Sequence, residues 1–143
     1  MSEPLARLIV LEATPQLAPL LRRFLPRKKI CEARSVALLK DMLVESPASF
    51  VICTTTAEAA PALLPVIANG VRRYSTSAWI VYGDEGLRRW EEFLLAAGAQ
   101  RVITSITQLP ALKHIIRQHL RRIKEPALPL IESIHARLPW PPK

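Results

Sequence analysis

Short apolar runs alternate along the chain with longer stretches in which apolar residues recur at helical spacing. The runs are rich in Ile, Val and aromatic residues, a composition typical of strands that are buried on both faces. Such runs predict five strands: Arg7–Leu11, Lys28–Ala33, Phe50–Cys53, Ala78–Tyr82 and Arg101–Thr104.

The first two stretches between these runs predict amphipathic helices with clear start and stop signals. Thr14-Pro15 predicts an N-cap and first turn, and Pro26 ends that helix. Ser35 predicts the N-cap of the second helix, which Pro47 stops. The residues predicted to face the core are Leu17, Leu20, Leu21, Phe24 and Leu25 in the first helix, and Val36, Leu39, Met42 and Leu43 in the second.

Three further helices follow the third, fourth and fifth strands. Pro61 and Pro65 predict that the third helix begins near Pro61 or is kinked there. The fourth spans Leu87–Ala97 and ends at Gly98 in a left-handed conformation, and Thr107 caps the fifth. Their predicted inner residues are Leu64, Ile67 and Val71, then Leu87, Trp90, Leu94 and Leu95, then Leu112, Ile115, Ile116, Leu120 and Ile123.

A strand followed by a helix thus occurs five times with short links. This alternation predicts an α/β fold, a three-layer αβα sandwich around a five-stranded parallel sheet, and strand order 2-1-3-4-5 is expected. Residues 1–124 are predicted to form this domain. Residues 125–143 are rich in Pro and are predicted to be a C-terminal extension, with a short amphipathic helix before the extended sequence LPWPP.

The composition fits a globular protein, with 50% hydrophobic residues and a net charge of +8. This charge permits an anionic partner without identifying one. No apolar run has the length of a membrane helix, and the start of the chain lacks the features of a signal peptide, so a cytoplasmic location is expected. Cys31 and Cys53 are expected to be buried free thiols, since two isolated cysteines form neither a disulfide framework nor a zinc site.

From Leu5 to about Arg122 the chain resembles a response-regulator receiver (CheY-like) domain, which has a flavodoxin-like fold. The resemblance rests on element order, on element length and on Ala97-Gly98-Ala99 before the fifth strand and its Thr-capped helix. It implies a phosphoryl-transfer site in which an acidic pair holds Mg²⁺ after the first strand and an Asp after the third strand accepts the phosphoryl group. A Thr or Ser after the fourth strand and a Lys after the fifth complete that site.

The chain departs from this pattern at most of these positions. Glu12 is a single carboxylate after the first strand, Thr54 stands where the Asp is expected, and Ser105 stands where the Lys is expected. Tyr82-Gly83 supplies neither Thr nor Ser after the fourth strand. A neutral Thr cannot form an acyl phosphate, so the sequence predicts a degenerate, non-catalytic pseudo-receiver. It is expected to be a protein-interaction or signalling module without enzymatic activity, cofactor or metal.

The resemblance also implies an interaction face on the fourth helix, fifth strand and fifth helix. Self-association or a protein partner is expected there, because Glu91 and Glu92 share this face with several basic residues, and mixed charges of this kind allow reciprocal ion pairs. Those bases are Arg88, Arg89, Arg101, Lys113 and Arg117. Trp140 in the extension is expected to anchor in a groove, on its own subunit or on another.

Two alternatives remain open from the sequence. A small-molecule or nucleotide-phosphate binder would use the crevice formed by Glu12 and Thr54–Thr56, although no glycine-rich phosphate motif occurs. A weak nucleic-acid binder would use the basic fifth helix. Its stripe consists of Lys113, Arg117, Arg121 and Lys124. His114, His119 and His135 are expected to be solvated or partly packed and not metal ligands.

Overall fold

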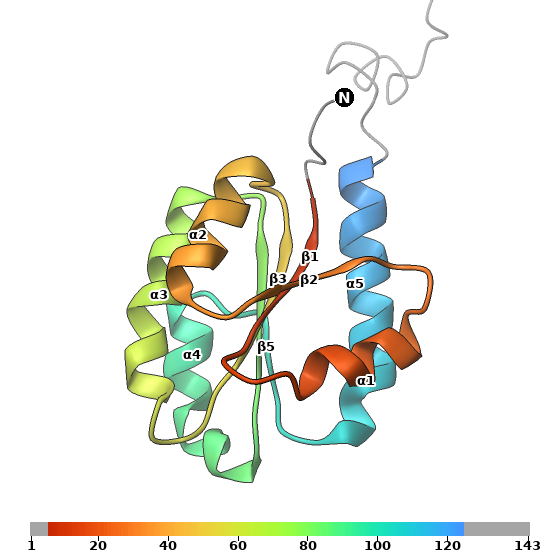
Figure 1. Ribbon diagram of the computed structural model, residues 1–143. Coiled ribbons are helices and arrows are strands. Elements are labelled where there is room, and N and C mark those ends of the chain that lie inside the picture. The colour runs from red at the N-terminus through yellow and green to blue at the C-terminus, as the bar shows by residue number, and fades with distance from the viewer. Residues whose placement is uncertain (1–5, 125–143) are drawn as a thin grey trace, which may run out of the picture.

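The computed structural model describes residues 6–124 of the chain, which form a five-stranded parallel sheet between two layers of helices (Figure 1). The strands are β1 (Leu8–Leu11), β2 (Ile30–Ala33), β3 (Phe50–Thr54), β4 (Ala78–Tyr82) and β5 (Arg101–Ile103). Their order is β2-β1-β3-β4-β5, which confirms the predicted fold class and topology. Strand ends differ from the predicted ranges by a residue or two. The predicted extension, including Trp140, lies outside the described residues.

Within residues 6–124, five α-helices and two 3₁₀ helices connect or follow the strands. They are α1 (Leu17–Phe24), α2 (Val36–Glu45), α3 (Ala60–Arg73), η1 (Glu85–Trp90), α4 (Glu91–Ala97), η2 (Ile106–Gln108) and α5 (Leu109–Lys124). Helices α1 and α5 cover one face of the sheet, and α2, α3 and α4 cover the other (Figure 1).

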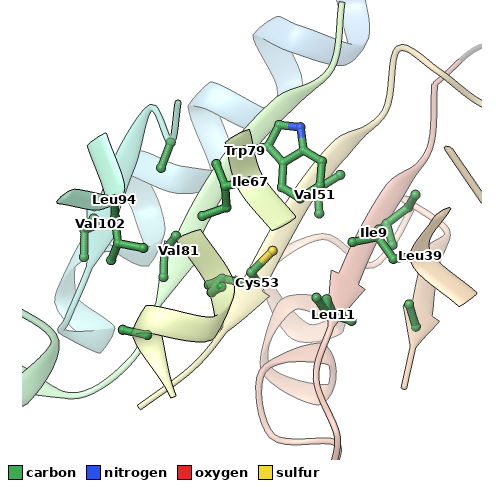
Figure 2. Close-up of a cluster of buried hydrophobic side chains, with 14 of the residues drawn as sticks. Ile9, Leu11, Leu39, Val51, Cys53, Ile67, Trp79, Val81, Leu94 and Val102 are labelled. Carbon is green, nitrogen blue, oxygen red and sulfur yellow. The ribbon is translucent and has the colours of Figure 1, made fainter. Parts of the chain in front are cut away.

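Alternation along the strands divides the buried side chains into two clusters. Leu8 and Val10 of β1 point toward α1 and α5. Ile9 and Leu11 point toward α2, α3 and α4, where Figure 2 shows them with their neighbours. Both faces of the sheet are therefore apolar, which explains why the strands appear in the sequence as continuous apolar runs.

Two predicted N-caps are wrong. Thr14 does not cap α1, because the helix begins only at Leu17 and its first N–H groups bond to the side chain of Glu12. Thr107 does not cap the last helix either. Ser105 and Gln108 form a capping box at the start of η2, and α5 follows directly from it. In contrast, Ser35 caps α2 as predicted, by accepting from the N–H of Leu38.

The third and fourth helices differ from the predictions in different ways. Helix α3 begins at Ala60, as the position of Pro61 predicted, and it accommodates Pro65 in its interior. The single helix predicted over Leu87–Ala97 is instead η1 followed by the shorter α4. Gly98 ends α4 with a φ of +127°, as predicted. Leu95 is 42% exposed, so its assignment to the inner stripe was wrong.

The two cysteines lie in different environments. Cys53 in β3 is fully buried, and desolvation raises the pKa of its thiol to about 12. Cys31 in β2 is partly exposed, so the prediction that both thiols are buried is wrong for this one. The difference arises because β2 is at the edge of the sheet and β3 is in the middle.

Gly70 in α3 allows this helix to lie close to the sheet. A Cβ atom at this position would be 2.1 Å from Cζ2 of Trp79, whose ring is buried below the helix. The indole Nε1 donates to Oγ of Ser77 at 2.8 Å, which also holds the ring in place. The distance between α3 and β4 is thus set by the absence of a side chain at position 70.

We expect Gly70→Ala to lower the free energy of unfolding by about 2 kcal/mol, because overpacking of the Trp79 ring outweighs the better helix propensity of Ala. Urea denaturation measures this change. Asn69→Ala is the matched control, since Asn69 is exposed in the same turn and its replacement introduces no buried contact. A Gly70→Ala variant as stable as the wild-type chain would contradict this account of the packing.

Candidate functional site

The carboxyl ends of the parallel strands bring three of the predicted site residues to one edge of the sheet. Glu12 directly follows β1, and Thr54 is the last residue of β3. Leu11 pairs with Cys53, so Glu12 and Thr54 occupy neighbouring positions on adjacent strands. Ser105 lies two residues after β5, farther along the same edge. Open α/β sheets bind ligands at this edge.

The carboxylate of Glu12 is buried against the start of α1, with the residue only 3% exposed. Its Oε1 accepts from the N–H groups of Gln16 at 3.1 Å and Ala18 at 3.0 Å. Its Oε2 accepts from the N–H group of Leu17 at 2.9 Å. The N–H groups of the first helical turn have no partner within the helix, and the helix dipole favours a negative charge there. Glu12 therefore acts as the cap of α1.

The hydroxyls of Thr54, Thr55 and Thr56 are all engaged by nearby backbone. Thr54 Oγ1 donates to the carbonyl oxygen of Leu11 at 3.2 Å and so ties β3 to the end of β1. Thr55 Oγ1 donates to the carbonyl oxygen of Thr56, and Thr56 Oγ1 accepts from the N–H of Ala59 just before α3. The structure brings Glu12 and these hydroxyls to one edge, but each of them holds a neighbouring segment in place.

The polar residues after β4 and β5 have similar local roles. Asp84 Oδ1 accepts from the N–H of Gly86 at 3.0 Å and caps η1. Ser105 Oγ lies 2.8 Å from Oγ1 of Thr107 and accepts from its N–H. Among residues 6–124, no three side chains of His, Cys, Asp or Glu come together in a way that would hold a metal ion.

The predicted interaction face contains a groove between α4, β5 and α5, with a volume of about 500 Å³. Arg101 lines this groove together with Glu91 and Leu95. The other predicted bases do not line it: Arg88 and Arg89 are exposed on η1, Arg117 is exposed on α5, and Lys113 is partly exposed there.

The basic residues of α5 lie at the surface, and the two described histidines differ in their burial. On the predicted basic stripe of α5, Arg117 and Arg121 are exposed and Lys113 is partly exposed. His114 is exposed, whereas His119 is half-buried with Nε2 2.7 Å from the carbonyl oxygen of Ala48. The ring of His119 also packs edge-on against Phe50 at 5.6 Å. His135 lies outside the described residues.

One ion cluster outside the predicted sites joins β2 to α1. Glu32 lies 2.7 Å from a guanidinium nitrogen of both Arg22 and Arg34. The hydrogen bond from Arg22, together with the charge of Arg34, lowers the pKa of the Glu32 carboxyl. All three side chains are partly or well exposed, so solvent screens this cluster.

Three solved structures have closely similar folds. A CheY-like protein (tadZ) from Pseudomonas aeruginosa PAO1 matches with a TM-score of 0.68 and 17% identity over 80% of this chain and 98% of that one. A response regulator receiver domain protein from Clostridium thermocellum matches with a TM-score of 0.64 and 14% identity, over 83% and 97%. The signal receiver domain of a protein from Vibrio parahaemolyticus matches with a TM-score of 0.62 and 15% identity, over 94% and 97%.

No family model matches the sequence, and a search of curated proteins finds no match either. At identities this low, the structural likeness establishes the fold alone. Residues 6–124 therefore have the CheY-like receiver fold. None of the described helices has the length and apolar character that are needed to cross a bilayer.

The magnesium ion that a receiver-type site implies does not fit the residues at this edge. Mg²⁺ is bound by oxygen ligands that include carboxylates with free lone pairs. Both carboxylate oxygens of Glu12 face the N–H groups of α1, and Thr54 and Ser105 contribute only neutral hydroxyls. We therefore derive no step through a metal ion here.

We expect Glu12→Gln to lower the free energy of unfolding by about 2 kcal/mol, since the new amide places N–H donors opposite the buried N–H groups of α1. Chemical denaturation at neutral pH measures the loss. Glu58→Gln, an exposed carboxylate just before α3, is the control and should change stability little. Equal stabilities of the two variants would show that Glu12 is not the cap of α1.

Proposed function

We propose that this chain is a signalling module that uses the receiver fold for protein interaction and does not transfer phosphoryl groups. The observation that carries the proposal is the position of the Glu12 carboxylate, which is buried and bonded to three backbone N–H groups of α1. A carboxylate in this position contributes to folding, and its burial against the start of α1 keeps it from a metal ion or a phosphoryl donor.

The residues near Glu12 also differ chemically from a phosphoryl-accepting site. Such transfer requires an activated nucleophile and positive charge that offsets the charge of the phosphoryl oxygens. Thr54 presents a neutral hydroxyl, and its proton is directed to the carbonyl oxygen of Leu11. Ser105, at the position where a receiver has a Lys, is neutral and is used in the capping box of η2. The absence of both the acceptor carboxylate and the Lys at these two positions supports a degenerate site.

The test is incubation of the full chain with a small phosphodonor and Mg²⁺, followed by intact-mass measurement under conditions that preserve acyl phosphates. We expect no phosphorylated species, because Thr54 is neutral at the acceptor position, Glu12 is buried as the cap of α1, and Ser105 stands where a receiver has a Lys. A receiver domain that retains its phosphoacceptor Asp, treated in parallel, establishes that the reagent is active. A stoichiometric adduct on this chain would overturn the proposal.

The groove between α4, β5 and α5 supports binding to a second copy of the chain or to another protein. Glu91 and Arg101 are both exposed in this groove, and within residues 6–124 neither makes an ion pair. Leu95 adds an exposed apolar contact beside them. A surface that carries an acid and a base close together is self-complementary, because a two-fold axis places each opposite the other.

We expect Arg101→Glu to weaken self-association about tenfold, since it replaces a reciprocal attraction by a repulsion worth about 1.4 kcal/mol. Combining it with Glu91→Arg should restore association. Sedimentation equilibrium measures both, and Arg27→Glu, a charge reversal in the α1–β2 link, is the control. A chain that stays monomeric at every concentration would contradict self-association through this groove.

A further inference from the structure

A second groove lies between α2 and α3, separated from the first by the α3–α4 pair. It has a volume of about 440 Å³. Leu39, Leu43 and Trp79 form its apolar base, and these belong to the buried cluster between the sheet and helices α2 to α4. Val44 on its rim is 66% exposed, although it is a branched aliphatic side chain. An apolar channel of this kind is where a protein commonly binds an apolar segment.

The groove exists because α3 lies close to the sheet and packs on α4. Gly70 lets α3 rest directly on the ring of Trp79, and Val71 packs against the backbone of Gly98 at the end of α4. Helix α2 instead packs mainly on β1 and β2. The space between α2 and α3 therefore follows from how the two helices pack on different parts of the sheet.

We propose that residues 125–143 of the same chain occupy this groove. The described part of the chain ends at Lys124, the last residue of α5. Near that end, His119 Nε2 lies 2.7 Å from the carbonyl oxygen of Ala48, and Ala48 belongs to the short link between α2 and β3. The chain thus leaves α5 at the same edge of the sheet as the C-terminal end of α2, but on the opposite face, and Leu43 and Val44 near that end of α2 line the groove.

The length of the remaining segment is sufficient. The 19 residues from 125 to 143 span up to about 60 Å when extended. This length is enough to pass around the amino edge of the sheet and then to follow the groove between α2 and α3.

The chemistry of the segment complements the groove. The segment contains apolar residues suited to the base of the groove: Leu130, Ile131, Ile134, Leu138 and Trp140. The segment carries two acids, Glu125 and Glu132, both in its first ten residues, and two basic residues, Arg137 and Lys143, near its end. The groove has three bases and one acid along its sides: Lys40, Arg72, Arg73 and Asp41. Five prolines also reduce the number of N–H groups that docking would bury without partners.

Tethering favours this segment over a second copy or another protein. A segment joined by a short linker has an effective concentration on the order of millimolar at a site within its reach. A free partner at lower concentration must bind correspondingly more tightly to displace it. The segment is therefore the preferred occupant of the groove even if its intrinsic affinity is modest.

Limited trypsin digestion of the full chain tests the proposal. The rate of cleavage after Arg137 is measured by intact-mass analysis. Val44→Glu places a charge on the rim of the groove and should speed this cleavage about tenfold, as docked segments are cut only after release. Leu38→Glu is the matched control, because Leu38 is also on α2 and 46% exposed but does not line the groove. Circular dichroism establishes that both variants are folded.

A second variant tests the same docking from the segment itself. Trp140→Ala leaves the groove intact and should speed cleavage as much as Val44→Glu does, and the two changes together should add little more. Equal cleavage rates in the wild-type chain and Val44→Glu would overturn the proposal. Protection that increases with protein concentration would also overturn it, since it would assign the groove to a second copy.

Discussion

A buried carboxylate at the end of β1 holds the first helix to the sheet. Glu12 is separated by only four residues from the start of α1, and its two oxygens accept three N–H groups from that helix. The backbone N–H of Glu12 donates to the carbonyl oxygen of Ala33 at the end of β2. One residue thus joins β1, β2 and α1 at the carboxyl edge of the sheet, and both the chemistry of that edge and the position of α1 depend on it.

The other polar residues at this edge follow the same principle. Thr54 bonds to the end of β1, Asp84 caps η1, and Ser105 caps η2. In a parallel sheet the carboxyl edge is where every strand turns into a helix, so it contains many N–H groups without helical partners. Polar side chains there either satisfy these groups or remain free for a ligand. At this edge Asp84 and Ser105 accept from N–H groups and Thr54 donates to a carbonyl group, so binding is assigned to the helical faces instead.

The sequence predicted the five strands because apolar runs and helical spacing are local signals, whereas their order was expected from the repeated alternation of strand and helix. It also predicted the cap at Ser35 and the turn at Gly98, where one residue determines the conformation. The role of Glu12 was missed, because Thr14-Pro15 is the stronger local start signal for a helix. The carboxylate of Glu12 contacts the start of α1 only because the loop between them folds back, and the sequence does not show this fold. The two grooves were not predictable either. They arise where helices that follow different strands pack with unequal spacing. This spacing depends on contacts between distant residues, so a short stretch of sequence does not reveal it.

The uneven spacing of the helical layer links the two surfaces that we assign to binding. Gly70 brings α3 down onto Trp79, and α3 in turn packs against α4. This pairing leaves one groove open on the α2 side and places α4 so that Glu91 and Leu95 line the other, next to β5. The grooves lie on opposite sides of the α3–α4 pair, so an occupant of one does not cover the other. Both depend on the same contact, and a change in the depth at which α3 lies on the sheet would alter the two surfaces together.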